Sequence, residues 1–350
     1  MMDFTPGESQ QAVAKLATQV LTGANPWKGL AQAGLLSIGG DGLGVLDVAV
    51  LLTEIGRRAT PDSLKALSTL MTGALPVVRW GSPDLQQALL PGVASGELLL
   101  TAALREPSNP APATPATTIT NGKITGTKVG VPYAEQSRLM LVPSFMIVAR
   151  NGHTEAKTGH DHGVALLSPH AEGVRLTRTP SSSGQPEYTL SMDEAPVAGV
   201  LGEAGCLRDL YHLAAAGACA LIDGAVAGAL ALTREHVATR RQFGRPLAAF
   251  QAVSQQIADV YIMSRTMHLA TLSACWRLAE SRDEAADLAV AGYWCAEHGP
   301  KSVRICHHLH GGLGMDVTYP LHRFSSLVSD LVRFLGGAEY RLERLACSST

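Results

Sequence analysis

Residues 240–251 read Arg-Arg-Gln-Phe-Gly-Arg-Pro-Leu-Ala-Ala-Phe-Gln, and they decide the fold together with His-His-Leu-His-Gly-Gly-Leu-Gly-Met-Asp at residues 307–316. An arginine near a helix end, with a glycine-rich turn opposite, can hold a pyrophosphate, because guanidinium forms charge-assisted hydrogen bonds and glycine allows close backbone approach. The ring of Phe243 can lie against an adenine or a ribose, and Gln251 can donate to ribose or phosphate oxygens. The two stretches therefore predict part of a dinucleotide site.

The composition is that of a soluble globular protein with a large core. Of the 350 residues, 46% are hydrophobic and 17% charged, and the net charge is −2 at pH 7. This balance, without a block of Lys and Arg, argues against a nucleic-acid partner and against an anionic membrane surface. Residues 1–8 lack the basic and apolar segments of a secretory signal, so we expect a cytoplasmic protein. The six cysteines, none in a C-x-x-C pair, are interpreted as buried free thiols.

The chain changes its pattern twice, which predicts three domains at residues 1–97, 98–202 and 203–350. In the first, a capping box at Thr5-Pro6-Gly7-Glu8 predicts a helix to about Leu21, and helical spacing recurs in 46–55 and 64–75. In the second, short β-rich runs separated by turn residues occupy 117–120, 123–129, 139–149, 163–167, 173–177 and 187–192. In the third, helices are predicted at about 208–239, 249–281, 284–298, 300–310 and 321–346.

This order of helices, strands and helices predicts an α+β fold. We expect an N-terminal helical domain, a small antiparallel β-barrel or sandwich, and a C-terminal four-helix bundle, because long helices joined by short loops favour such bundles. The strands and helices do not alternate, which argues against a doubly wound nucleotide fold. The apolar run 211–232 is long enough to span a membrane, but it contains His212 and Asp223 and is rich in Ala and Gly. We therefore interpret it as a core helix.

The strings at 240–251 and 306–320 resemble the C-terminal domain of acyl-CoA dehydrogenases, in order and in separation. Residues 39–44 resemble that family's N-terminal loop, and residues 192–197 resemble the exit from its β-domain, so the resemblance covers essentially the whole chain. In this family such residues serve an FAD that is bound mainly by a neighbouring subunit. The resemblance implies an FAD half-site in this chain, formed by Arg240, Gln242, Phe243, Gln251, His308, Gly311 and Gly312.

Other interpretations of these residues are open. Arg240 could be a solvated helix end and Phe243 a core residue. His308 stands where the family more often has Gln. The cluster of His307, His308 and His310 invites a metal interpretation, but its spacing places only His307 and His310 on one helical face, without an acidic partner, so we assign no metal. The run 160–162, His-Asp-His, is interpreted as solvated.

The chain departs from the family where the flavin ring and the acyl-CoA would bind. The family's T-E-P-x-x-G-S-D segment reads Arg-Glu-Pro-Ser-Asn-Pro at 105–110, without the hydroxyl and the Gly-Ser-Asp. The family's K-x-W-I-T-N strand reads Lys-Val-Gly-Val-Pro-Tyr at 128–133, with Gly130 in place of the Trp that shields the flavin. The resemblance therefore implies that this chain lacks most of an isoalloxazine pocket of its own.

The catalytic base is missing as well. In the family, a carboxylate removes the α-proton while the β-hydride leaves to the flavin. The two positions that carry this carboxylate fall on Leu335 and Ala214 here. The nearest carboxylates are Asp209, Asp330 and Glu339, of which Glu339 and Asp209 are weak candidates. A charge at a helix N-terminus or on a solvated face is the favoured interpretation of each of the three.

The chain thus resembles the smaller subunit of actinobacterial α2β2 acyl-CoA dehydrogenases that act on steroid side chains. The resemblance implies an FAD shared with a homologous partner subunit, which supplies the base and the acyl pocket, an acyl-CoA substrate of steroid type, and electron transfer to an electron-transferring flavoprotein. One alternative is a self-sufficient dehydrogenase with a relocated base. Another is a structural paralogue that binds neither flavin nor CoA.

Overall fold

The computed structural model describes residues 6–150, 153–156, 162–201 and 205–348. The chain divides into two compact units. The helical unit comprises residues 1–22, 49–63 and 215–350, and the sheet unit comprises residues 23–48 and 64–214. Three helices, α3 (Val45–Gly56), the short α4 (Ser63–Ala66) and α7 (Cys206–Thr239), contribute residues to both units.

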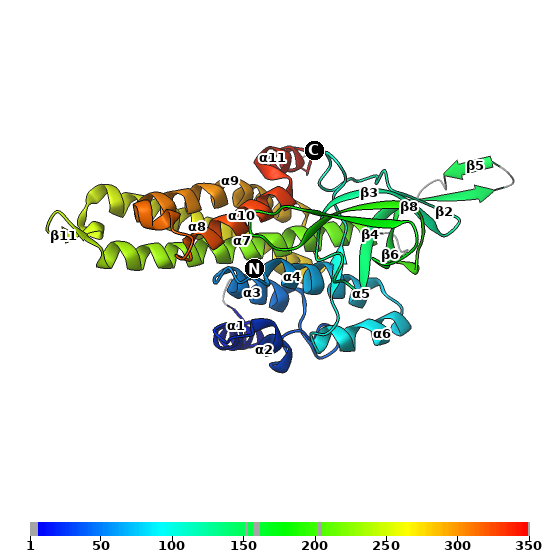
Figure 1. The fold of residues 1–350 in the computed structure, drawn as a ribbon, viewed down its shortest axis with the longest axis horizontal. Helices are drawn as coiled ribbons and strands as arrows, with labels where there is room; N and C mark the ends of the chain where they lie inside the picture. Colours follow the sequence, from blue (N-terminus) through cyan, green and yellow to red (C-terminus); the bar gives the residue numbers. More distant parts are fainter. Residues whose placement is uncertain (1–5, 151–152, 157–161, 202–204, 349–350) are drawn as a thin grey trace. The chain divides into compact units, whose positions relative to one another are not determined.

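Long helices make up most of the helical unit (Figure 1). They are α1 (Glu8–Val20), the greater part of α3 and of α7, α8 (Gln251–Ala279), α9 (Ala285–His310), α10 (Leu321–Leu335) and α11 (Gly337–Ser348). A short hairpin, β10 (Arg241–Gln242) and β11 (Arg245–Pro246), and the 3-10 turn η2 (Leu247–Ala249) join α7 to α8; the 3-10 turn η3 (Gly311–Met315) follows α9. The resulting bundle confirms the predicted C-terminal helical architecture.

Glycines let α7 lie unusually close to its neighbours. A Cβ at Gly224 would lie 2.0 Å from the Thr53 carbonyl oxygen, and a Cβ at Gly228 would lie 2.2 Å from that of Arg57. The helix is apolar and long enough to cross a membrane, but 94% of its most apolar 18-residue window is buried inside the protein. Close packing of small residues therefore accounts for the composition of α7, as predicted for a core helix.

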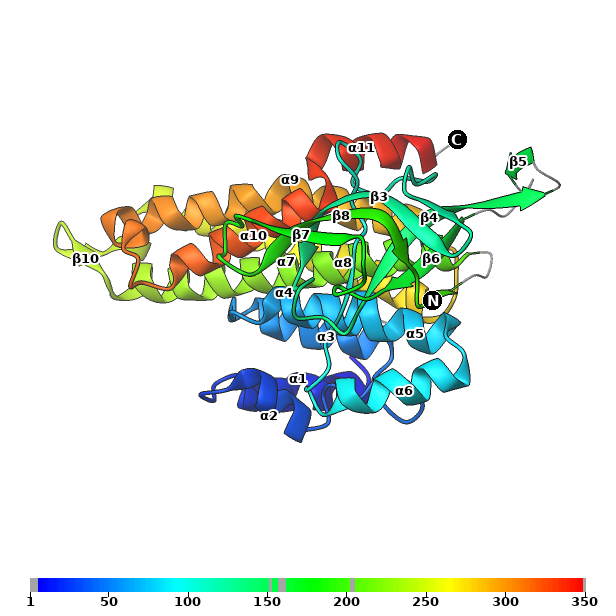
Figure 2. The same ribbon diagram turned by 45° about the vertical axis from the view of Figure 1, so that its right-hand side comes forward.

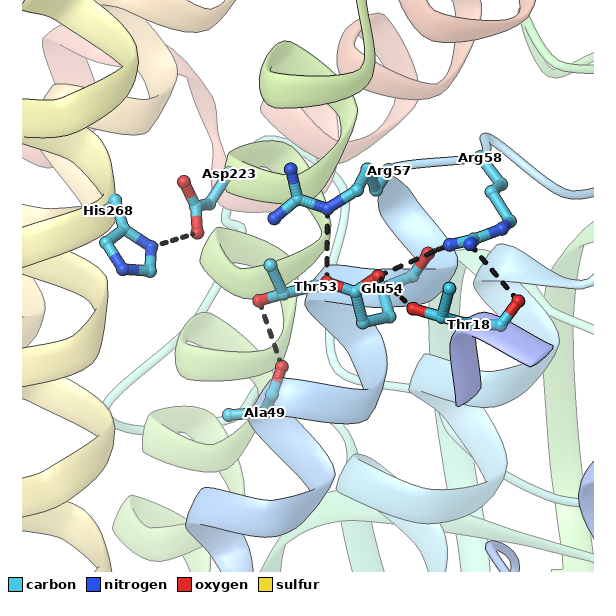
Figure 3. Close-up of polar contacts among 8 residues, drawn as sticks. All are labelled: Thr18, Ala49, Thr53, Glu54, Arg57, Arg58, Asp223 and His268. Atoms are coloured by element: carbon cyan, nitrogen blue, oxygen red, sulfur yellow. Dashed lines mark hydrogen bonds and ion pairs between the residues drawn. The ribbon is translucent and has the colours of Figure 1, made fainter. Parts of the chain in front are cut away.

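Polar contacts fix neighbouring helices of this unit (Figure 3). Glu54 of α3 accepts hydrogen bonds from Arg57 Nε at 3.1 Å, Arg58 Nη1 at 3.3 Å and Thr18 Oγ1 of α1 at 3.2 Å. The buried Asp223 of α7 contacts His268 Nδ1 of α8 at 2.8 Å. Each partly buried carboxylate therefore has donors that offset its desolvation.

Three helix boundaries differ from the prediction. Helix α1 begins at Glu8 with Gly7 as N-cap and no side-chain cap, so Pro6 precedes the helix; Thr5 lies outside the described residues. The segments predicted at 284–298 and 300–310 form one helix, α9, with Pro300 inside it. The segment predicted at 321–346 is broken at Gly336 and Gly337, whose φ angles of 90° and 87° are left-handed and so end α10.

The sheet unit begins with short helices. They are α2 (Pro26–Gln32), α4 (Ser63–Ala66), η1 (Leu67–Ala74), α5 (Leu75–Trp80) and α6 (Pro83–Ala94). Two of them, α2 and α6, have a side-chain N-cap and proline as the first helical residue. The Asn25 side chain accepts a hydrogen bond from the Lys28 amide, and the Ser82 side chain accepts one from the Leu85 amide. The η1 segment is a π-helix with all its residues buried, whereas the sequence pattern predicted only a helix.

A nine-stranded sheet forms the rest of this unit (Figure 2). Its strands are β1 (Leu100–Ala102), β2 (Thr118–Thr120), β3 (Lys123–Pro132), β4 (Leu139–Arg150), β5 (His153–Ala156), β6 (His162–Leu167), β7 (Val174–Thr179), β8 (Glu187–Pro196) and β9 (Gly199–Leu201). Most neighbours are antiparallel, but β1 and β2 each pair with β4 in parallel. A buried apolar cluster that includes Ile124, Met140 and Leu190 forms its core.

Candidate dinucleotide half-site

The stretch that follows α7 folds into a tight hairpin. Gln242 pairs with Arg245, so the two turn residues are Phe243 and Gly244, with φ angles of 52° and 79°. Two positive φ angles are what a two-residue hairpin turn requires, and they favour glycine; at Phe243 they impose strain. Arg241 Nη2 donates to the Gly244 carbonyl at 3.0 Å, and the Arg245 guanidinium lies 4.1 Å from the ring centre of Phe250.

The hairpin presents Phe243 to solvent. Its side chain is 90% exposed, and its ring meets that of Phe250 edge-on with centroids 6.2 Å apart. The alternative that Phe243 is a core residue is therefore wrong. A strained backbone that holds an aromatic ring in water costs stability and gains no burial, which indicates that the ring is held for a ligand or a partner.

The glycine-rich turn lies at the same end of the bundle. Helix α9 ends at His310, and the His310 ring stacks on that of His236 of α7 with centroids 4.4 Å apart. The turn then exposes Gly311 and Gly312, and a Cβ at either position would meet no atom within 4 Å. The backbone of this turn is therefore open to close approach from outside.

All seven residues predicted for the half-site are exposed: Arg240, Gln242, Phe243, Gln251, His308, Gly311 and Gly312. Among the described residues, none forms an ion pair with the Arg240 guanidinium. An unpaired guanidinium and an open glycine turn fit an outside pyrophosphate, and an exposed aromatic ring fits an adenosine. This end of the helical unit could therefore hold the adenosine diphosphate part of FAD.

A groove behind the hairpin was not predicted from the sequence. It has a volume of about 590 Å³ and lies between the last turns of α7 and the start of α8, with Arg234 and Glu235 on one wall and Ser254 and Ile257 on the other. The residues that line it are ordinary helix-surface residues, so no local pattern marks them. The half-site therefore includes a groove in addition to the exposed residues of the hairpin and the glycine turn.

The histidines of the glycine-rich stretch face different partners. His307 Nε2 lies 3.0 Å from Ser325 Oγ, whereas His310 Nε2 lies 3.1 Å from the Tyr319 hydroxyl. Both rings are thus engaged within the bundle. Of the run at 160–162, His160 and Asp161 lie outside the described residues, and the His162 ring packs near Phe145.

The positions of the family base are buried and apolar. Leu335 is completely buried and Ala214 nearly so. Asp209 accepts hydrogen bonds from Arg79 and, at 2.7 Å, from Trp80 Nε1, so its carboxylate fastens α5 to the first turns of α7. Asp330 is buried beside Arg333, and Glu339 is exposed on α11. Of the three nearby carboxylates, only that of Glu339 is directed to solvent.

The strand that resembles part of the family's flavin-ring pocket has a bulge in this chain. The pairing of β3 with β8 shifts register between Lys128 and Val131, and Gly130 has a φ of 66° in that bulge. A tryptophan at this position would be strained, because side chains other than glycine rarely adopt such a φ. The backbone at Gly130 therefore favours glycine over the tryptophan that the resemblance to the family leads one to expect there.

A buried ion pair lies beside this bulge, which the sequence did not predict. Lys128 Nζ donates to Glu106 at 2.8 Å, and the carboxylate also accepts from the amides of Ala116 at 2.9 Å and Thr117 at 3.0 Å. Burial lowers the pKa of Lys128 to about 8, against the opposing effect of the Glu106 carboxylate. The Glu106 carboxylate therefore ties together the two ends of the loop 107–115, and its oxygens are occupied by contacts within the protein.

Comparison with known proteins agrees with this architecture. The family model for the acyl-CoA dehydrogenase (ACAD) N-terminal domain matches residues 3–97, and that for the ACAD C-terminal domain matches residues 210–345. The fold and the two matched domains define an acyl-CoA dehydrogenase. This chain belongs to that family, whose members are FAD-dependent oxidoreductases.

Relatives match along the whole chain. Acyl-CoA dehydrogenase FadE28 of Mycobacterium tuberculosis is 46% identical, with 100% of both chains covered. Among solved structures, a chain of the ChsE4-ChsE5 complex from Mycobacterium tuberculosis matches with a TM-score of 0.87 and 30% identity, over 99% of this chain and 98% of that one. A chain of the Tcur3481-Tcur3483 steroid ACAD matches with a TM-score of 0.86 and 30% identity, over 98% of each chain.

Proposed function

We propose that this chain is the half-site subunit of a heteromeric acyl-CoA dehydrogenase. It contributes Arg240, Gln242, Phe243, Gln251, His308, Gly311 and Gly312 to an FAD shared with a homologous partner subunit. The partner supplies the carboxylate base, the flavin-ring pocket and the acyl pocket. The assembly is an α2β2 tetramer that desaturates an acyl-CoA and passes its electrons to an electron-transferring flavoprotein.

One observation supports this proposal above the others: the retained and the lost functions lie in different places. The exposed end of the bundle keeps a guanidinium, that of Arg240, with no ion-pair partner in the described part of the chain, an open glycine turn and a strained, exposed aromatic ring. The base positions hold buried Leu335 and Ala214, and β3 bulges at Gly130. A chain without any flavin function has no reason to hold Phe243 in a strained, solvent-exposed turn.

The chain's own residues then act by binding and orientation. The Arg240 guanidinium would neutralise the pyrophosphate, the amides of the Gly311–Gly312 turn would help to hold it, and Phe243 would provide an aromatic surface for the adenosine. When bound, FAD supplies the hydride acceptor of the reaction. Because this chain places no carboxylate at the family's base positions, proton abstraction is the partner's task.

The substrate we propose is a steroid side-chain acyl-CoA. The structural relative described as a steroid ACAD and the ChsE4-ChsE5 complex are each assemblies of two different chains, and this chain matches a chain of each over nearly its whole length. The acyl group itself is recognised by the partner in this proposal, so the specificity belongs to the pair.

The visible spectrum of the purified chain tests the proposal, first alone and then after co-expression with a homologous dehydrogenase subunit. We expect a colourless chain alone and a yellow complex with about one FAD per pair of different subunits, as a shared site requires. Gly312→Val should abolish or strongly reduce the bound FAD without affecting folding, since a side chain there meets no protein atom.

The same experiment separates the alternatives. If the chain alone carries a full complement of FAD and desaturates acyl-CoA, it is a self-sufficient dehydrogenase, and Glu339→Gln should then abolish the activity. If no complex with a homologous subunit contains FAD, the chain is a structural paralogue. Gly44→Val, at an exposed glycine that is remote in sequence from the proposed site and whose nearest contact for a Cβ is at 3.6 Å, controls for nonspecific effects of adding the same side chain.

A further inference from the structure

His310 lies directly under the open glycine turn, and its surroundings fix its protonation. The ring is 5% exposed, and its Nδ1 lies 2.8 Å from the Cys306 carbonyl oxygen. A carbonyl only accepts, so Nδ1 carries the hydrogen. The Tyr319 hydroxyl lies 3.1 Å from Nε2. In the neutral ring Nε2 carries no hydrogen, so it accepts the hydrogen bond that the tyrosine hydroxyl donates. Both ring nitrogens are thus satisfied by one neutral tautomer.

The ring connects the two parts of the half-site. On one side it is the last residue of α9, directly before Gly311 and Gly312. On the other side it stacks on His236, four residues before Arg240 on α7, with an angle of 19° between the rings. The position of the glycine turn relative to Arg240 therefore depends on this stack.

From this geometry we propose that His310 is a positioning residue for the FAD half-site, and that it holds the glycine turn in place only while its ring is neutral. The inference rests on the proposed shared FAD site. Protonation of Nε2 would turn the acceptor of the Tyr319 hydrogen bond into a donor and would place a positive charge against the face of His236. The turn and Arg240 would then separate, and FAD would be released.

Most of the charged and titratable groups around the ring favour the neutral form, and Glu235 is the exception. From α7, His236 and Arg240 are potential or permanent positive charges, and Glu235 lies near Tyr319; from α9 and α10, His307 and His322 face the same region. Burial lowers the pKa of His310, and the neighbouring His236 and His307 lower it further, against the hydrogen bond to Cys306. Burial and Arg240 also lower the pKa of His236.

The sign of the pH effect follows from these directions. A histidine whose pKa is lowered in the folded state stabilises that state fully above its ordinary pKa of about 6.5. As the pH falls from there toward the lowered pKa, the unfolded or opened state binds more protons and the arrangement loses stability. We therefore expect FAD to be held at pH 7 and above and to be released progressively below about pH 6.5.

FAD retention by the co-expressed complex, followed through its visible absorbance after buffer exchange across pH 5 to 8, tests the proposal. His310→Asn keeps a donor near Cys306 but loses the Nε2 acceptor and the stacked ring. It should weaken FAD binding at pH 7.5 by about tenfold, the size of one lost buried hydrogen bond, and should flatten the pH profile. Tyr319→Phe keeps the ring and its shape but frees Nε2 for protonation, so the pH of release should move upward.

His298→Asn is the matched control. His298 is also on α9, half-buried and stacked on Trp294 at 4.4 Å, and burial lowers its pKa too, but it lies three turns before His310. It should leave the pH profile of FAD retention unchanged. Nitrogen NMR of the histidine rings in the wild-type complex gives a second readout, in which His310 should show the Nδ1–H tautomer at pH 7.5.

The outcomes separate this inference from the proposed function. If the wild-type complex contains no FAD at any pH, the shared half-site is wrong and the role of His310 is wrong with it. If the wild type binds FAD but Tyr319→Phe leaves the pH of release unchanged, or NMR shows a charged His310 ring at pH 7.5, only the inference about His310 is overturned. Should His310→Asn fail to fold, the Tyr319→Phe profile and the NMR spectrum still decide.

Discussion

At the scale of single residues, two side chains lie in places that are unusual for their residue type. Phe243 is almost fully exposed in a strained conformation, whereas Lys128, a residue type that normally lies at the surface, is completely buried. The first gains no stability from its position. The second is tolerated because Glu106 accepts its hydrogen bond and compensates its charge.

Glu106→Gln tests that compensation. The change leaves a buried lysine without its carboxylate, so we expect a loss of about 3–5 kcal/mol in the free energy of unfolding at pH 7, measured by urea denaturation. The pKa of Lys128 is about 8 when folded and about 10.4 when unfolded. Raising the pH across this window therefore adds stability, because the unfolded chain holds more protons there.

In Glu106→Gln the lysine pKa falls further, and the folded variant can lose the proton at lower pH. The deficit relative to the wild type should thus be smaller at pH 9 than at pH 7. Lys123→Gln, which removes the exposed partner of Glu194, serves as the control and should change stability by less than about 1 kcal/mol. An equal deficit at both pH values would contradict a charged Lys128 in the wild type.

At the scale of elements, local sequence patterns predicted the strands and helices that depend on neighbouring residues. They did not predict the features that depend on contacts between distant segments. The strands at 117–120, 123–129 and 187–192 were predicted to within a few residues, because their alternation and turn residues are local. The bulge at Gly130 and the Glu106–Lys128 pair join segments 22 or more residues apart, so they could not be predicted from periodicity. The π-helical form of η1 has the same apolar pattern as an α-helix.

The candidate site divides in the same way. A long, specific string predicted the residues of the half-site, and the structure exposes each of them, whereas the hairpin that carries Phe243 was not predicted. The stack of His236 on His310 links helices 74 residues apart in the chain and has no local signal. Pro300 predicted a helix end that does not occur, because α9 continues through it with buried residues on both sides.

Gly224→Ala tests the close packing of α7 and α3. The new Cβ would lie 2.0 Å from the Thr53 carbonyl oxygen and 2.8 Å from the Arg57 amide nitrogen, and backbone atoms cannot move aside without shifting the helix. We expect a loss of stability of about 3 kcal/mol or more in thermal or urea unfolding, at the upper end for overpacking. Gly44→Ala, with its nearest contact at 3.6 Å, should be nearly neutral; equal effects would contradict the close approach.

At the scale of the whole molecule, the chain belongs to the acyl-CoA dehydrogenase family, and the two positions that its resemblance to the family assigns to the base hold Leu335 and Ala214. Placing a carboxylate at such a position should not give the isolated chain activity. Leu335→Glu places a carboxylate at a completely buried position, while the β3 bulge at Gly130 still excludes the shielding Trp. We expect no desaturation of acyl-CoA in a dye-reduction assay and a clear loss of stability.

Leu335→Met is the volume-matched control. The isolated variant chain should be about as stable as the wild type and should show no dehydrogenase activity. Dehydrogenase activity in the isolated Leu335→Glu variant would mean that the chain possesses a flavin pocket of its own, and the half-site proposal would then be wrong.

The hairpin at 240–247 has a consequence for how the cell must handle this chain. An orphan copy displays an aromatic ring on a stiff projection, and such exposed surface attracts chaperones and other unpaired chains. In the heteromer that we propose, synthesis in balanced amounts with the partner would bury that ring soon after translation. Under that proposal, the exposed phenylalanine would make production of the subunit without its partner costly, and it would tie together the expression levels of the two subunits.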